Sequence, residues 1–356
     1  MPPKDRFKTY ITSLTPKDNI AILHHTDADG ITAGLITKKS IKKLCAISIA
    51  LHFHQNEGKI TITKETIDLI TTNNINKLII VDMAIDHDPD AVKKLEQHAR
   101  LLLIDHHKTA NNINSKTTTV VKAEDLKDIP SAKYPASKMC YDLFSDLIDI
   151  TDLAWLAAIG IWGDYAQSQW PDFLKKTAIP EHTLEEIDEL IFYSGSIKEK
   201  DGLTDSFNIL DAAKTPEDIL KSTKLQSYKN TVITELNKYL DAHKKDAQYH
   251  NAGTLIIYEI APKHKIKSRL INILSQKHYQ NKTIVILEHH NTHIDISARR
   301  NDSKLSMNDM LKCALEGIPN SQGGGHIPAA GGYLPKEYLD KFKKQVITYC
   351  KEKDLQ

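Results

Sequence analysis

Short runs of consecutive apolar residues alternate with longer amphipathic stretches along the first third of the chain. The clearest runs are residues 20–23, 78–81 and 101–104. Apolar runs of this length are typical of parallel strands that are buried on both faces. The predicted strands are 19–25, 47–53, 77–82, 100–105 and 117–122, and the predicted helices between them are 31–44, 63–71 and one that begins at Asp88-Pro89, with Asp as cap and Pro in the first turn. This alternation predicts a mostly parallel sheet with helices on both faces.

The pattern becomes helical after residue 137 and returns to an α/β pattern near residue 253. Helices are predicted at 137–147 and 151–168, and the polar, Lys- and Glu-rich stretch 180–245 is also helical. The later elements are predicted as strands 254–260, 283–287 and 293–298, helices from Lys267 and Ser306, a glycine cluster and a C-terminal helix. We therefore predict an α/β fold with a parallel-sheet domain at 1–175, a helical connector at 176–250 and a smaller α/β domain at 251–356.

The composition, net charge and cysteine spacing argue against several classes of protein. The chain has 356 residues, of which 40% are hydrophobic and 26% charged, as in ordinary globular proteins. Its formal net charge of +1 excludes a general basic field, so any binding of nucleic acid must use local groups. The four cysteines are far apart and form no CxxC pair, which argues against a zinc ribbon. No apolar leader or membrane-length segment is evident, and a cytoplasmic location is expected.

Acidic and imidazole side chains follow three of the predicted strands. His25-Thr26-Asp27-Ala28-Asp29-Gly30 follows the first, Asp82 ends the third, and Asp105-His106-His107 ends the fourth. Residues just past the carboxyl ends of parallel strands face the functional edge of an open sheet. Each cluster alone also fits a turn or a strand-end cap, but all three at strand ends favour a metal site. Oxygen and imidazole ligands without thiolates suit Mn²⁺ or Mg²⁺ better than Zn²⁺.

These motifs carry a family resemblance. HTDADG, the Val81-Asp82 strand end, Asp105-His106-His107 and Gly160 with Asp164 resemble the four motifs of the DHH phosphoesterases. The segment Gly323-Gly324-Gly325-His326, followed by Ala329-Ala330-Gly331-Gly332, resembles the glycine-rich motif of the DHH-associated domain. The HxDxDG form is most similar to that of the RecJ-like single-strand exonucleases, including the archaeal ones.

The resemblance implies roles for individual residues. His25 and Asp27 would bind one metal ion, Asp29, His106 and Asp164 would bind a second, and Asp82 would bridge them. Asp105 would orient the neighbouring imidazole, and His107 would face the scissile phosphate. Asp164 also fits an exposed carboxylate one helical turn after Gly160. The adjacent Tyr165 is open between core packing and base stacking.

The second domain is expected to contact the substrate. Gly323, Gly324, Gly325 and His326 would form a loop whose amides approach a phosphate closely, with a flexible loop as the alternative interpretation. Arg299 is the candidate that similar segments of the family offer to the substrate phosphate, whereas Arg300 is interpreted as solvated. The basic stretch from Lys263 to Arg269 fits a solvated helix start better than a strand-binding patch. His289, His290 and His293 invite a metal hypothesis but are interpreted as surface residues of a hairpin turn.

The resemblance implies a metal-dependent phosphodiesterase that digests single-stranded DNA or RNA from an end to mononucleotides by a two-metal mechanism. The active site is expected between the two domains, with His107, Asp105, Arg299 and His326 as its catalytic groups. Replication or repair proteins are expected partners, and no membrane is. One alternative is a hydrolase of dinucleotides, cyclic dinucleotides or very short oligonucleotides. A second, from another class, is a catalytically silent replication scaffold.

Overall fold

The computed structural model describes residues 1–55, 62–197 and 199–354, and the chain forms two compact units, 1–229 and 230–356. The predicted boundaries at 175/176 and 250/251 stay a prediction. The structure divides the chain inside α11 (Thr223–Asp246), a single helix with residues in both units. None of the described helices is long and apolar enough to cross a lipid bilayer.

The first unit is built on a five-stranded sheet in which all strands are parallel. Its order is β2-β1-β3-β4-β5. The strands are β1 (Ile20–His24), β2 (Leu51–His54), β3 (Lys77–Val81), β4 (Arg100–Asp105) and β5 (Thr118–Lys122). The chain leaves β1 toward β2 and returns on the other side as β3, so the switch in strand order lies between β1 and β3. In sheets of this kind ligands bind at that point.

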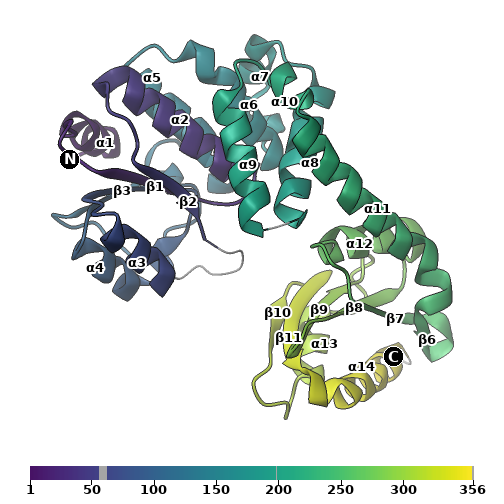
Figure 1. Ribbon diagram of the computed structural model, residues 1–356. Helices are drawn as coiled ribbons and strands as arrows, with labels where there is room; N and C mark the ends of the chain where they lie inside the picture. The colour runs from purple at the N-terminus through teal and green to yellow at the C-terminus, as the bar shows by residue number, and fades with distance from the viewer. Residues whose placement is uncertain (56–61, 198, 355–356) are drawn as a thin grey trace. The chain divides into compact units, whose positions relative to one another are not determined.

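Helices cover both faces of this sheet because each central strand is apolar on both sides (Figure 1). On one face lie α1 (Pro3–Thr12), α2 (Ala28–Cys45), α5 (Ala136–Ser145) and α6 (Ala154–Gly163). On the other face lie α3 (Lys64–Thr72) and α4 (Pro89–Glu96). Asp88 caps α4 as predicted, by accepting a hydrogen bond from the Ala91 amide at 3.0 Å. The mostly parallel α/β architecture is confirmed.

Further helices complete the first unit. They are α7 (Pro171–Thr177), α8 (Glu181–Ile197), α9 (Glu199–Ala212) and α10 (Pro216–Leu220). Leu184, Ile187 and Phe207 are buried in the same core as the sheet. The stretch that is polar in composition therefore contributes an apolar face to this unit.

The second unit has a mixed six-stranded sheet with the order β10-β11-β9-β8-β7-β6. Its strands are β6 (Gln248–His250), β7 (Leu255–Ile260), β8 (Thr283–His289), β9 (His293–Arg299), β10 (Gln322–Gly325) and β11 (Ala329–Pro335). Its helices besides the end of α11 are α12 (Lys267–Ile273), α13 (Met307–Ala314) and α14 (Leu339–Asp354). The apolar sides of α13 and α14 pack on one face of the sheet.

Three element predictions are wrong in detail. The strand predicted at 47–53 is confined to Leu51–His54, because α2 ends at the left-handed Ala46 (φ 57°) and a connection follows. The helix predicted to reach residue 168 ends at Gly163, and Tyr165 adopts φ 52° soon after. The glycine cluster is strand β10 rather than a loop, because it pairs with β11 as a hairpin.

Candidate metal centre

The first group of candidate ligands lies where β1 ends and α2 begins. Asp27 caps α2 by accepting a hydrogen bond from the Gly30 amide at 3.0 Å. His25 Nδ1 lies 2.8 Å from Asp27 Oδ2 and 3.7 Å from Asp82 Oδ2. One ligand atom from each of His25, Asp27 and Asp82 lies within 4.8 Å of the other two. The geometry therefore brings together the three residues expected at one ion.

A second group lies against the first. Asp29, His106 and Asp164 also place one ligand atom each within 4.8 Å of the others. His106 Nδ1 is 3.5 Å from Asp164 Oδ2, and Asp164 stands at the C-terminal end of α6. Asp29 is fully buried and accepts hydrogen bonds from the amides of Ala136 and Ser137 at 2.6 and 2.9 Å. The start of α5 thus fixes the orientation of this carboxylate.

Gly160 explains how α6 comes so close to this carboxylate. A Cβ atom at Gly160 would lie 2.1 Å from Ser137 Oγ and 2.6 Å from Asp29 Oδ1. Both distances are too short for any side chain. The glycine of the fourth motif is therefore required by the packing of α6 against α2 and α5.

Asp82 stands between the two groups. It follows β3 with φ 59°, a left-handed conformation that Asp tolerates better than most residues, and it is only 2% exposed. Its Oδ1 is 3.3 Å from His106 Nε2, and its Oδ2 faces His25. One carboxylate thus contacts an imidazole from each group, as a bridging ligand would.

The buried carboxylates of this cluster repel one another, and a bound cation would relieve this repulsion. Burial and the neighbouring carboxylates Asp29, Asp27 and Asp164 raise the pKa of Asp82 well above its ordinary value. Burial and the first two of these raise the pKa of Asp164 to about 9, and its place at a helix C-terminus adds further negative potential. Within the described residues, Asp82 Oδ1, His106 Nδ1 and Asp164 Oδ2 are buried without a hydrogen-bond partner. Buried polar atoms of this kind fit metal ligands, so the donor set suits the divalent ion that the family implies.

His107 is held by a buried charge network beside the cluster. Its Nδ1 lies 2.7 Å from Asp105 Oδ1, and the other Asp105 oxygen accepts from the Lys122 ammonium at 2.6 Å. Lys122 also contacts Asp86 at 2.9 Å, and all three members of this Asp86–Lys122–Asp105 network are at most 1% exposed. The imidazole that Asp105 orients is therefore that of His107. The hydrogen bond with Asp105 raises the pKa of His107.

Sequence reasoning missed Asp86 and Lys122. A signal for Lys122 was present, because it is the one charged residue of the predicted strand 117–122 and directly follows two valines. In the sheet it pairs directly with Asp105 across β4 and β5. Asp86 also accepts a hydrogen bond from the Ala110 amide at 2.7 Å, which ties down the segment that follows His107.

The predicted substrate residues of the second unit lie at one end of its sheet. Arg299 ends β9, is half-buried, and donates to Asn272 Oδ1 at 3.2 Å. Gly323, Gly324 and Gly325 lie on the edge strand β10, and His326 is exposed in the turn that follows. The prediction that Arg300 is solvated is wrong. It is 7% exposed and pairs with Asp302 at 2.9 Å.

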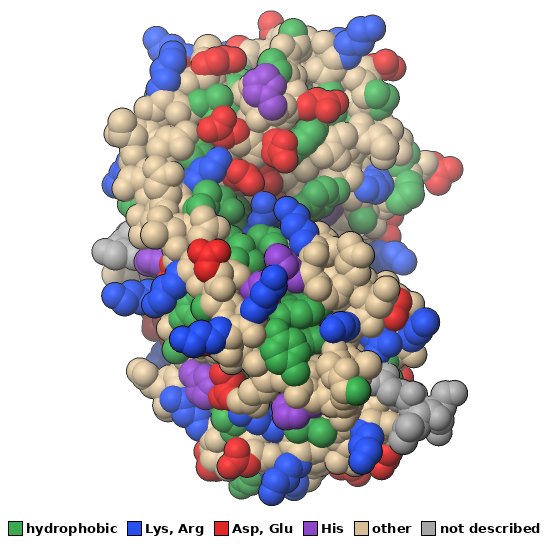
Figure 2. All heavy atoms as spheres, turned by 90° about the vertical axis from the view of Figure 1, so that its right-hand side faces the viewer, with side chains coloured by type: hydrophobic (Ala, Val, Ile, Leu, Met, Phe, Trp, Pro, Cys, Tyr) green, Lys and Arg blue, Asp and Glu red, His purple; other side chains and the backbone are tan. Residues whose placement is uncertain are grey.

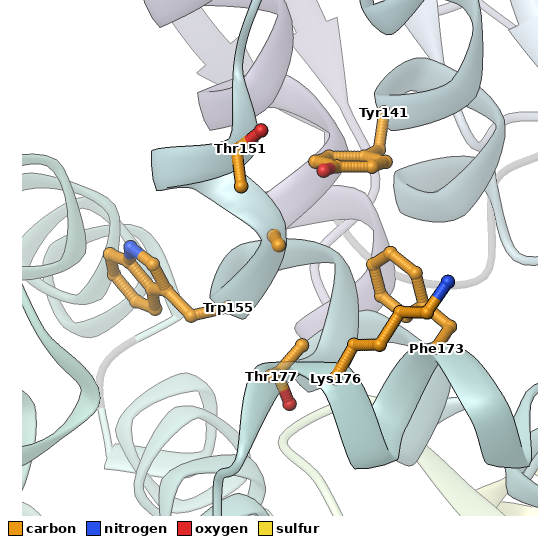
Figure 3. A pocket seen from close by; sticks show the side chains of 7 residues that line it. Tyr141, Thr151, Trp155, Phe173, Lys176 and Thr177 are labelled. Atoms are coloured by element: carbon orange, nitrogen blue, oxygen red, sulfur yellow. The ribbon is translucent and has the colours of Figure 1, made fainter.

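Two other features of the first unit concern ligand binding. Tyr165, next to Asp164, is 75% exposed, which excludes core packing. A separate cavity of about 470 Å³ is lined by Tyr141, Thr151, Ala154, Trp155, Phe173, Lys176 and Thr177. In the view of Figure 3, Trp155 lies across this cavity from Tyr141 and Phe173. None of the predicted site residues lines it.

Comparisons with known proteins agree with this arrangement. The sequence model of the DHH family N-terminal domain matches residues 19–161, and that of the DHHA1 domain matches residues 254–352. A search of curated protein sequences finds no significant match.

Solved structures share the fold. A DHH domain described as belonging to a family of ribosomal proteins is 18% identical, with a TM-score of 0.69 over 93% of this chain and 87% of that one. An exonuclease RecJ bound to manganese is 16% identical, with a TM-score of 0.69 over 98% of this chain and 94% of that one. RecJ from Thermus thermophilus in complex with Mn²⁺ is 15% identical, with a TM-score of 0.66 over 98% of this chain but only 54% of that one.

The fold and the cluster together define a two-domain α/β protein with a carboxylate–imidazole centre at the switch point of a parallel sheet. The chain belongs to the DHH phosphoesterase family, with a C-terminal DHHA1 domain and a RecJ-like fold.

Proposed function

We propose that the protein is a metal-dependent phosphodiesterase that digests single-stranded DNA or RNA from an end. The observation that carries this proposal is the pair of ligand groups joined by Asp82 beside the half-exposed His107. His25, Asp27 and Asp82 would hold one divalent ion, and Asp29, His106 and Asp164 with Asp82 a second. Mn²⁺ is the expected ion, with Mg²⁺ as the other candidate. Such ions supply an activated water and neutralise charge on the phosphoryl oxygens.

His107 would act directly on the substrate. Because Nδ1 is bound to Asp105, the other ring nitrogen, Nε2, is left for a phosphoryl oxygen. The raised pKa of His107 favours the protonated imidazole, which donates a hydrogen bond and carries positive charge. Asp105 fixes the ring and compensates this charge, so its role is to position His107. Arg299, His326 and the β10 amides would contact phosphates of the same substrate, and Tyr165 is available to stack on a base.

The charge distribution supports a short contact with nucleic acid. On the face drawn in Figure 2, Lys and Arg side chains are interspersed with Asp and Glu. With a net charge of +1, few phosphates are neutralised at once, so the salt dependence of binding is expected to be shallow. Free cysteines at positions 45, 140, 313 and 350 suit a reducing cytoplasm. A role in DNA repair or replication, with partners from those systems, belongs to the same proposal.

The test is digestion of labelled single strands of graded length in Mn²⁺, with DNA and RNA run in parallel. We expect stepwise shortening from one end, poor attack on blunt duplex and no cleavage of covalently closed single-stranded circles. Cleavage of closed circles would exclude an exonuclease. Activity confined to dimers and trimers would favour the short-oligonucleotide hydrolase instead, and no hydrolysis of any substrate would favour the silent scaffold.

A further inference from the structure

A second set of metal-binding side chains lies in the other unit, at the β8–β9 hairpin. The two strands pair antiparallel, with Glu288 opposite Asp295, and the turn is closed by a hydrogen bond from the His290 amide to the His293 carbonyl at 3.0 Å. His290 and His293 thus flank the turn, and Asp295 follows two residues later on β9. The predicted hairpin turn is confirmed, and the three histidines interpreted as its surface residues, His289, His290 and His293, are each half-buried.

The two imidazoles face one carboxylate. The rings of His290 and His293 are stacked, with centroids 4.6 Å apart and planes 14° from parallel. Nε2 of His290 is 3.3 Å from Asp295 Oδ2, and Nε2 of His293 is 3.4 Å from Asp295 Oδ1. The three ligand atoms lie within 4.8 Å of one another. This spacing is what a single ion needs in order to draw in all three with small side-chain rotations.

The hydrogen bonding leaves these nitrogens available. Among the described residues, His290 Nε2 is shielded from solvent and has no hydrogen-bond partner. His293 uses its other nitrogen, Nδ1, toward Thr292 Oγ1 at 3.3 Å, the kind of outer contact that fixes a ligating imidazole. Glu288 adds a carboxylate oxygen 3.9 Å from His290 Nε2. The Lys267 ammonium, 3.2 Å from Asp295 and 3.5 Å from Glu288, offsets only part of the negative charge.

We propose that His290, His293 and Asp295 bind a divalent transition-metal ion of the zinc, nickel or cobalt type. Two imidazole nitrogens and one carboxylate favour these ions over Mg²⁺ and Ca²⁺, which prefer oxygen ligands. The site differs from the first centre, where four carboxylates outnumber two imidazoles. It lies at the start of β9, and Arg299 is at the other end, about 20 Å away along an extended strand. The ion would tie the hairpin turn to β9 and leave the substrate residues untouched.

The test counts bound Ni²⁺ by equilibrium dialysis of the full chain, with excess Mg²⁺ present. His290→Ala and His293→Ala are compared with the wild type and with His289→Ala, a control that removes a histidine of the same hairpin outside the cluster. We expect the wild type and the control to bind one more Ni²⁺ than the two cluster variants, or to bind it at least about tenfold more tightly. Equal Ni²⁺ binding by all four proteins would overturn the proposal, and so would an equal loss in the control.

A second measurement does not depend on the variants folding. Crystals of the wild-type chain grown with Zn²⁺ should show anomalous scattering at the zinc edge, with the ion about 2.0–2.2 Å from His290, His293 and Asp295. Zinc density at the first centre alone would contradict the hairpin site. Asp295→Asn should remove only the hairpin peak.

Discussion

At the scale of single residues, the family's metal residues cluster as their motifs predict. The six expected ligands come from four segments between His25 and Asp164, and they form two groups that share Asp82. This clustering of the ligands is predictable from the sequence, because strand ends and motif order indicate which side chains meet. The network behind His107 is not, because it depends on which strand neighbours β4 and on how deeply Lys122 is buried.

Asp82→Asn separates the role of Asp82 in catalysis from its effect on stability. Asn tolerates the left-handed backbone, so the fold should persist. We expect Mn²⁺-dependent turnover to fall by at least about 100-fold. The metal-free protein should melt about 2–4 °C higher, because a buried, repelled carboxylate is gone. Hydrolysis rates and thermal melts by circular dichroism provide the test, and wild-type turnover in the folded variant would refute the bridging role.

Asp164 predicts a pH dependence of stability. Its pKa is raised to about 9, so the folded chain holds a proton that the unfolded chain has released at neutral pH. Its stabilising contribution is complete below about pH 4 and is lost as the pH rises toward 9. The melting temperature of the metal-free protein should therefore fall across this range, and the increase produced by Mn²⁺ should grow. In Asp164→Asn both trends should be weaker, and identical melting curves for the two proteins across this pH range would contradict the assignment.

At the scale of elements, β4 and β5 are joined by charge as well as by backbone hydrogen bonds. Lys122→Met would leave Asp86 and Asp105 buried without their common cation. Breaking such a network costs about 3–5 kcal/mol in the free energy of unfolding. Lys43→Met is the matched control, since it removes an exposed pair with Asp152 worth about 0–1 kcal/mol.

Urea unfolding of the two lysine variants measures this difference, and turnover of the folded fraction reports on His107. We expect kcat to fall in Lys122→Met, because Asp105 no longer holds the imidazole in one orientation, while metal binding persists. Equal stabilities for the two variants would show that the buried network contributes nothing.

The predicted element boundaries agree with the structure where a capping side chain marks the start of a helix. They disagree where pairing between distant strands determines the element. Asp88 and Ser306 begin helices as their side chains predict, each accepting a hydrogen bond from the amide three residues on. The glycines at 323–325 have the composition of a turn, but they pair with β11 and form an edge strand of the sheet. Pairing between distant segments cannot be read from composition, which is why the sequence predicts a loop where this strand lies.

At the scale of the whole molecule, the α/β class and the existence of two domains are predictable from alternating patterns. The order of the strands in each sheet is not predictable, because an apolar run does not indicate which strand it pairs with. The division of the chain at residue 229 also depends on α8 and α9 packing into the first core, which their polar composition conceals.

The candidate metal ligands and the candidate phosphate-binding residues lie in different units. We therefore expect metal binding and substrate binding to be impaired by different substitutions. Arg299→Ala and His326→Ala lie in the second unit, outside the cluster that surrounds Asp82. We expect both variants to keep the Mn²⁺ affinity of the wild type and to raise KM for single strands, since contacts to phosphate are lost. Calorimetric titration with Mn²⁺ measures the first quantity and steady-state kinetics the second. Loss of Mn²⁺ affinity in either folded variant would refute this division.

The spread of the ligands along the chain has a consequence for biosynthesis. The first, His25, and the last, Asp164, are separated by about 140 residues, so at about 5–20 residues per second the ribosome needs about 7–28 s to supply the full set. During that interval the emerging segment carries only part of the cluster, and α6, which precedes Asp164, is not yet made. Under the proposed function, the group of His25, Asp27 and Asp82 could therefore come together before Asp164 is made, whereas the group that contains Asp164 could form only after α6 is complete. We expect the nascent chain to offer one ion site before it can offer the second.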